Sequence, residues 1–173
     1  MYYTPYKLQD NNNKNTWIRS LFETEDGTLL IGTEDGLLTL DIPSKKVKVV
    51  KEFSKAVVYS FMKDHEDGLW LGTYFNGLYY IPPQKNDIRW YCESDDSQSM
   101  TGSAVSQFCE DSKGNIWIAT EDGGLNYFNT TSREFTHYKT SGSDYKIGHN
   151  NIHALMLDGR YLWIGTFSKG IEI

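Results

Sequence analysis

The fold can be inferred from residues 110–138, which read EDSKGNIWIATEDGGLNYFNTTSREFTHY. A turn glycine, Gly114, precedes the apolar run Ile116–Ala119. A short polar turn then ends in glycine, and two further apolar segments follow. Short apolar runs separated by Gly and polar residues predict β-strands joined by tight turns. No window of 11 residues along the chain keeps a capped helical period, so we predict an all-β protein.

The same frame occurs four times. The copies are Glu25–Leu37, Glu66–Leu78, Asp111–Leu125 and Asp158–Ile171. Each copy contains one marker threonine, and these threonines are spaced by 40, 47 and 46 residues: Thr33, Thr73, Thr120 and Thr166. An apolar strand precedes each copy, and another follows the first three. Four strands in roughly 40–50 residues is the period of a propeller blade.

We therefore predict one β-propeller region over residues 1–173, with about four four-stranded antiparallel blades. The approximate blades are residues 16–53, 56–93, 103–139 and 151–173, the last completed by a strand at residues 2–8. Pairing a strand from one end of the chain with strands from the other would remove exposed sheet edges. An open fragment, a small closed ring and half of a two-chain ring all remain compatible with the sequence.

Two local features have a structural explanation. Asp26-Gly27 and Asp67-Gly68 are expected to supply the positive φ that a tight hairpin needs. The second strand carries a large side chain in each copy, which is expected to pack between neighbouring sheets: Leu30, Trp70, Trp117 and Trp163.

Composition limits the function classes. The 173 residues have a net charge of −6, 39% hydrophobic residues and 14% aromatic residues, an ordinary globular balance apart from the many aromatics. The acidic charge argues against a nucleic-acid partner. No apolar run is long enough to cross a membrane, so we expect no membrane contact, and the N-terminus lacks a secretory signal pattern. Cys92 and Cys109 form no metal motif; they could pair or act as small apolar side chains.

The repeated pattern [DE]-x-x-G-x-(L/I)-W-(I/L)-G-T-x-x-x-G-(L/I) resembles the propeller repeat of two-component regulators. The copies that carry the resemblance best are Glu110–Tyr138 and His65–Ile81. The resemblance implies a periplasmic sensor region of the hybrid two-component systems of Bacteroidetes, whose ligands are typically glycan fragments. It implies a non-catalytic role for this chain, since the kinase of such systems lies elsewhere. It also implies an oligosaccharide ligand, and a partner that is either a second copy of the chain or the remainder of a larger propeller.

A ligand is expected at the turns between the second and third strands, which gather on one face of a propeller. Large aromatic side chains at turn tips are unusual, and they could stack on sugar rings beside polar groups. The candidate binding residues are Glu34, Tyr74, Phe75, Asn76, Glu121, Phe167 and Lys169. Alternatively, the aromatic residues pack on the adjacent blade, and the two Glu-Asp-Gly turns are ordinary turns.

The sequence favours a binding protein over an enzyme. Glu34-Asp35 and Glu121-Asp122 are pairs of carboxylates, but nothing in the sequence separates their pKa values as acid catalysis requires. The turn beginning at Asp111 only approximates the Asp box of sialidases. We expect no cofactor and no metal. The leading hypothesis is a sensor or ligand-binding module. A scaffold for interaction or self-assembly, for example as a homodimer, is the alternative, and a propeller lyase or glycosidase is a third hypothesis.

Overall fold

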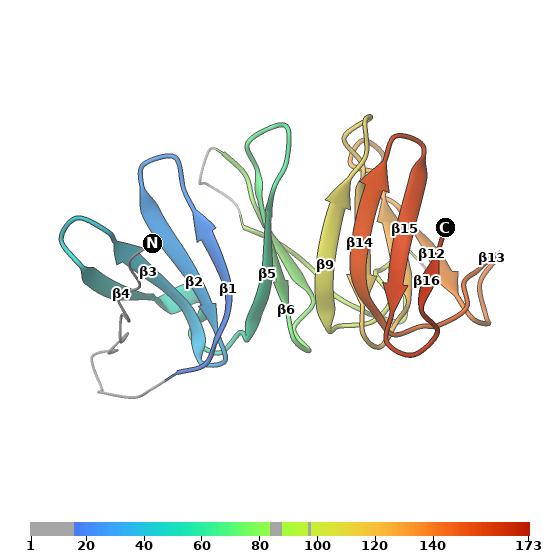
Figure 1. Cartoon of the computed structure of the whole chain (residues 1–173), viewed down its shortest axis with the longest axis horizontal. Helices are drawn as coiled ribbons and strands as arrows, with labels where there is room; N and C mark the ends of the chain where they lie inside the picture. Colours follow the sequence, from blue (N-terminus) through green and yellow to red (C-terminus); the bar gives the residue numbers. More distant parts are fainter. Residues whose placement is uncertain (1–15, 84–87, 97) are drawn as a thin grey trace. The chain divides into compact units, whose positions relative to one another are not determined.

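The computed structural model describes residues 16–83, 88–96 and 98–173 (Figure 1). The strand expected at residues 2–8 lies outside these residues. The chain divides into two compact units, Met1–Val58 and Tyr59–Ile173.

The first unit contains one antiparallel sheet in the order β1-β2-β3-β4. A short 3₁₀ helix, η1 (Lys51–Phe53), follows this sheet. The strands are β1 (Ile18–Glu23), β2 (Thr28–Thr33), β3 (Gly36–Asp41) and β4 (Lys46–Val50). Ile31, Leu37 and Phe53 are buried in this unit.

The second unit contains three sheets, and sequential strands pair in each of them. One sheet has β5 (Val58–Lys63), β6 (Leu69–Thr73), β7 (Leu78–Ile81) and β8 (Arg89–Tyr91). The next has β9 (Val105–Glu110), β10 (Ile116–Thr120), β11 (Leu125–Phe128), β12 (Phe135–Lys139) and β13 (Tyr145–Lys146). The last has β14 (Ile152–Asp158), β15 (Tyr161–Thr166) and β16 (Ile171–Glu172).

The third sheet departs from the four-strand prediction. β13 adds to β12 in parallel, through Tyr138 opposite Tyr145 and Lys139 opposite Lys146. The stacked rings of Tyr138 and Tyr145, with centroids 4.9 Å apart, reinforce this pairing. A segment expected to be a loop thus forms a fifth strand.

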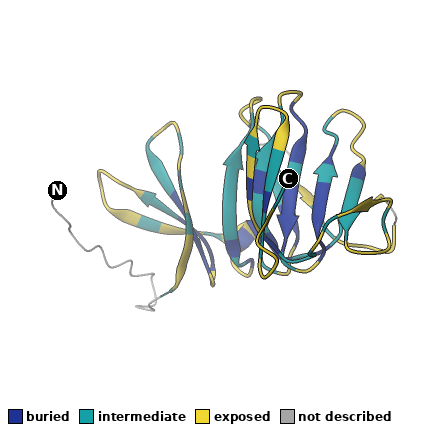
Figure 2. Ribbon diagram, turned by 45° about the vertical axis from the view of Figure 1, so that its right-hand side comes forward, coloured by how far each residue is buried: buried dark blue, intermediate teal, exposed yellow. Residues whose placement is uncertain are grey.

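The sheets of the second unit pack face to face through apolar side chains. β9 lies against β6 of the preceding sheet and against β14 of the following one (Figure 1). Trp70, Phe108 and Phe128 belong to one core cluster, and Leu125, Ile152 and Ile164 belong to the next. Buried residues are accordingly concentrated in these strands (Figure 2). The expected packing of Trp70 between neighbouring sheets is confirmed, since it is only 2% exposed.

The marker threonine closes the turn between the second and third strands of every sheet. In the third sheet, the Thr120 hydroxyl donates to the Gly124 carbonyl at 2.7 Å and accepts the Gly123 N–H at 3.0 Å. The same donation to a glycine carbonyl recurs at Thr33, Thr73 and Thr166. Thr120 is fully buried, and both roles of its hydroxyl are satisfied.

The glycine that accepts this bond cannot easily be replaced. Gly77 has a φ of 71°, and a Cβ on it would lie 2.3 Å from the Tyr91 carbonyl oxygen. Only glycine combines this left-handed backbone with so close an approach.

The turns between the first and second strands of the first two sheets differ in which residue adopts a positive φ. Gly27 does so as expected, with a φ of 77°. In the second sheet the Asp67-Gly68 pair also supplies the positive φ, and the residue that adopts it is Asp67, with a φ of 66°. A Cβ on Gly68 would collide with the Tyr80 ring, so this glycine is needed for space.

We expect Thr120→Val to lower the free energy of unfolding by about 1–3 kcal/mol, because it leaves buried polar backbone groups without their hydroxyl partner. Urea unfolding followed by tryptophan fluorescence measures the change. The matched control is Thr131→Val, since Thr131 is exposed in a turn of the same sheet. Equal losses in the two variants would contradict this role of the buried hydroxyl.

Candidate functional site: an aromatic cleft between two sheets

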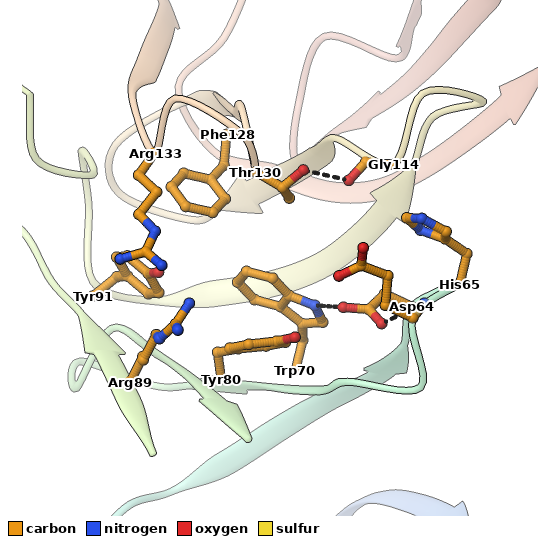
Figure 3. A pocket seen from close by; sticks show the side chains of 11 residues that line it. Asp64, His65, Trp70, Tyr80, Arg89, Tyr91, Gly114, Phe128, Thr130 and Arg133 are labelled. Carbon is orange, nitrogen blue, oxygen red and sulfur yellow. Dashed lines mark hydrogen bonds between the residues drawn. The ribbon is translucent and has the colours of Figure 1, made fainter. Parts of the chain in front are cut away.

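A cleft opens between the sheets β5–β8 and β9–β13, with a cavity of about 70 Å³ (Figure 3). In each of the two sheets, most of the residues that line the cleft come from the turn between the first and second strands and from the adjoining ends of the third and fourth strands. Its lining residues are Asp64, His65, Glu66, Trp70, Tyr80, Arg89, Tyr91, Gly114, Phe128, Thr130 and Arg133.

Aromatic rings form the wall of the cleft. The Trp70 ring centroid lies 4.5 Å from that of Tyr80, 5.9 Å from that of Phe128 and 6.3 Å from that of Tyr91. Trp70 and Phe128 are each 2% exposed, so their packing fixes the wall. Burial raises the pKa of Tyr80 above its ordinary value, so its hydroxyl stays protonated at neutral pH.

The cleft has a cationic side. Figure 3 shows the guanidinium groups of Arg89 and Arg133 on the same side of the cleft, beside the Tyr91 ring. The Arg89 guanidinium carbon lies 5.8 Å from the centroid of the Tyr80 ring, a cation–π distance. Arg133 has a φ of 63°, and its N–H donates to the Asn129 carbonyl at 2.8 Å, so a defined turn presents it.

The opposite side of the cleft is acidic and is built by a hairpin turn. Asp64 accepts the Gly68 N–H at 2.7 Å with one carboxylate oxygen and the Trp70 indole N–H at 2.7 Å with the other. Asp64 therefore fixes both the turn and the aromatic wall, and its carboxylate is already occupied by protein donors. Glu66, in the same turn, is exposed.

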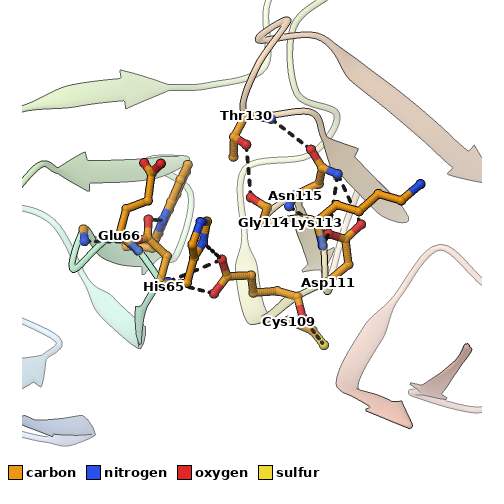
Figure 4. Close-up of polar contacts among 12 residues, drawn as sticks. His65, Glu66, Cys109, Asp111, Lys113, Gly114, Asn115 and Thr130 are labelled. Atoms are coloured by element: carbon orange, nitrogen blue, oxygen red, sulfur yellow. Dashed lines mark hydrogen bonds and ion pairs between the residues drawn. The ribbon is translucent and has the colours of Figure 1, made fainter. Parts of the chain in front are cut away.

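His65 connects the two sheets at the rim of the cleft (Figure 4). Its imidazole forms an ion pair and hydrogen bond with Glu110, whose carboxylate also accepts the His65 backbone N–H at 3.0 Å. The hydrogen bond that the His65 imidazole donates to Glu110 raises the pKa of His65 above its ordinary value of 6.5, and the charges of Glu110, Glu66 and Asp64 add to this effect. A Cβ on Gly114 would lie 2.4 Å from the imidazole, so this glycine makes room for it.

The neighbouring turn is organised by Asp111. Its carboxylate accepts the N–H groups of Lys113 at 2.8 Å and Asn115 at 2.9 Å, and the Tyr127 hydroxyl at 2.9 Å. Partial burial would raise the pKa of Asp111, but these hydrogen bonds outweigh burial and lower it. The aspartate that makes this turn resemble an Asp box therefore serves to hold the turn together.

The predicted binding residues lie at the other end of the strands. Six of them are in the turns after β6, β10 and β15, and Glu34 is in the first unit. Two of these turns in the second unit contact the segment leading into the next sheet. The Gly77 N–H donates to the Ser103 carbonyl and the Gly124 N–H to the Asn150 carbonyl. The turns thus share one edge of this unit, opposite the cleft.

The predicted aromatic residues differ in burial. Phe75 is 63% exposed and Phe167 is 70% exposed. Tyr74 is half-buried between Phe75 and Tyr59, with centroid distances of 4.1 Å and 5.1 Å. The Phe167 ring stacks on His153 at 5.5 Å. Asn76 and Lys169 are also exposed in these turns.

The acidic members of the predicted site lie in ordinary turns. Glu34 pairs with Arg19 within the first unit. Glu121 is half-buried, and its backbone N–H donates to the Ala104 carbonyl at 2.9 Å. Its neighbour Asp122 accepts the N–H groups of Ser103 and Ala104, both at 3.1 Å. The role of the seven residues as a ligand site stays a prediction.

The cysteines and the acidic and histidine side chains are the remaining candidates for reactive or metal-binding groups. Cys92 and Cys109 are free thiols, and burial raises the pKa of Cys109. Among the described residues, no group of three or more His, Cys, Asp or Glu side chains could hold a metal ion. None of the helices within these same residues has the length and apolar character needed to span a membrane.

The cleft was not predicted from the sequence. The residues that line the cleft come from several turns and strands of two sheets, so no contiguous sequence motif marks them. Arg89 is the first residue of β8, whereas Arg133 lies in the turn before β12. The two arginines therefore occupy different positions of the repeat, and no recurring residue marks them in the sequence.

We expect His65→Asn to lose stability relative to the native protein mainly at acidic pH. A pKa raised on folding contributes stability that is complete below 6.5 and disappears as the pH rises through the higher folded value. Unfolding free energies measured from pH 5 to 9 for both proteins give the difference. In a Glu110→Gln background the difference should lose its pH dependence. A difference that grows with pH would contradict the ion pair.

Comparison with known proteins supports the repeat analysis. Residues 99–122 match the family model described as the two component regulator propeller. No curated protein matches the sequence.

Two solved structures illustrate the fold. One is an extracellular domain assigned to a hybrid two component system of B. thetaiotaomicron. It has 21% identity and a TM-score of 0.56, and the match covers 94% of this chain and 28% of that one. The other is a catalytically inactive variant of virginiamycin B lyase from Staphylococcus aureus, solved with quinupristin. It has 13% identity and a TM-score of 0.64, and the match covers 96% of this chain and 58% of that one.

At these identities the structural likeness shows the fold, and the chain spans about 28% of the length of the first structure. The all-β propeller architecture predicted from the sequence is confirmed. The family match lies on β9, β10 and the residues around them. Residues 99–122 therefore carry the two component regulator propeller repeat that the sequence pattern predicted.

Proposed function

We propose that this chain is a non-catalytic sensor segment of the two component regulator type, located outside the inner membrane, and that it binds a glycan fragment. The family match over residues 99–122 and the likeness to an extracellular domain of such a system support the sensor assignment. The proposed location rests on the same comparisons.

One observation carries the ligand proposal: Phe75 and Phe167 are exposed aromatic residues in corresponding turns of two sheets. Turn tips normally carry small polar residues, so two exposed rings in these turns offer an unusual apolar surface to a ligand. Asn76 and Lys169 lie in the same turns and offer hydrogen-bonding groups. An aromatic face next to polar groups matches a sugar ring, whose apolar face stacks while its hydroxyls are bound.

The groups around these turns favour binding over catalysis. Asp122 holds neighbouring backbone N–H groups, and Glu34 pairs with Arg19. The likeness to a lyase at 13% identity concerns the fold.

We expect Phe75→Ala and Phe167→Ala each to weaken glycan binding by about tenfold, since losing one stacking ring costs roughly 1–1.5 kcal/mol. Isothermal titration calorimetry against an oligosaccharide panel measures the affinity. Circular dichroism should show that both variants remain folded.

Tyr161→Ala is the matched control. Tyr161 is 48% exposed but lies at the start of β15, at the opposite end of that strand from Phe167. Its removal should leave the affinity unchanged. Equal affinity in all three variants and the native protein would exclude these turns from the binding site.

A further inference from the structure

We propose that the aromatic cleft between the sheets β5–β8 and β9–β13 binds the carboxylate group of a small organic ligand through Arg89 and Arg133. This site lies at the opposite strand ends from the proposed glycan site and does not depend on it.

The first observation behind this proposal is the pair of positive charges in the cleft. Among the described residues, no carboxylate is paired with Arg89 or Arg133, although both guanidinium groups lie on one side of the cleft (Figure 3). Two like charges in one cavity repel each other, and an anion between them would relieve this repulsion. The planar guanidinium fork matches a carboxylate, which it can bind through two parallel hydrogen bonds.

The protein's own acidic groups do not fulfil that role. Asp64 is occupied by the Gly68 N–H and the Trp70 indole. His65 and Glu110 neutralise each other at the rim. In Figure 3, Asp64 and His65 lie across the aromatic wall from the two arginines. The cationic side of the cleft is thus available to a ligand.

The wall and the size of the cleft define the rest of the ligand. Tyr80 and Tyr91, both half-buried, offer partly accessible rings next to the arginines. The cavity of about 70 Å³ could hold a few waters, or a carboxylate with the first atoms of a ring. A carboxylate attached to a small ring therefore fits, whether it comes from a sugar acid or from an amino acid.

The test compares ligands that differ only in charge. The pairs are glucuronate with glucose, and N-acetylphenylalanine with its amide. Binding is followed by NMR through the Trp70 indole N–H, which lies in the wall of the cleft. We expect at least one carboxylate to bind about tenfold or more tightly than its uncharged partner, and to weaken with added salt. The tighter of the two carboxylates identifies the source.

Variants distinguish this site from a general charge effect. Arg89→Met and Arg133→Met should each reduce the carboxylate affinity by about tenfold, and Arg89→Lys should reduce it less. The matched control is Arg160→Met, because Arg160 is also exposed and lies over a tyrosine ring, at 5.1 Å from Tyr161.

The outcomes are separable from those for the glycan site. Phe75→Ala and Phe167→Ala should leave carboxylate binding unchanged. The proposal is overturned if charged and uncharged partners bind equally, if neither binds, or if Arg160→Met weakens binding as much as the cleft variants do.

Discussion

The repeat depends on a threonine hydroxyl in each sheet, which is fully buried in three of the four. The marker threonine ends the second strand, and its hydroxyl donates to the carbonyl of a glycine that begins or immediately precedes the third strand, so the turn and the strand register are fixed together. Thr33, Thr73 and Thr120 are fully buried. Because an unpaired hydroxyl is costly there, the threonine and its left-handed glycine are required as a pair. This explains why they recur while the residues between them vary.

That constraint frees the residues between the threonine and the glycine for other roles. The turn can present Phe75 in one sheet and Asp122 in another without changing its closure. In contrast, the first hairpin turns are closed by side chains such as Asp64 and Asp111, whose carboxylates bind backbone N–H groups. Side chains in these turns are needed for turn closure, so their sequence can vary less than that of the threonine turns. The cleft lies at this end of the strands.

The sequence was informative wherever a feature repeats. The strands, the buried Trp70 and the threonine turns all follow from local pattern and period. The Asp-Gly pairs were enough to predict a positive φ in both turns, but not that Asp67 adopts it in the second sheet or that the Tyr80 ring fills the space beside Gly68. The ion pair between His65 and Glu110 joins residues 45 positions apart in two sheets. Such contacts depend on how sheets face each other, which a single sequence does not encode locally.

The fifth strand of the third sheet has a consequence for association. An outer strand normally leaves a row of backbone N–H and C=O groups free to template another chain. In the third sheet, β13 occupies part of that row along β12. The chain therefore shields this margin with its own connecting segment. Insertions or cuts within residues 140–147 would expose this edge of β12. The exposed backbone groups would then be open to pairing with a strand of another chain.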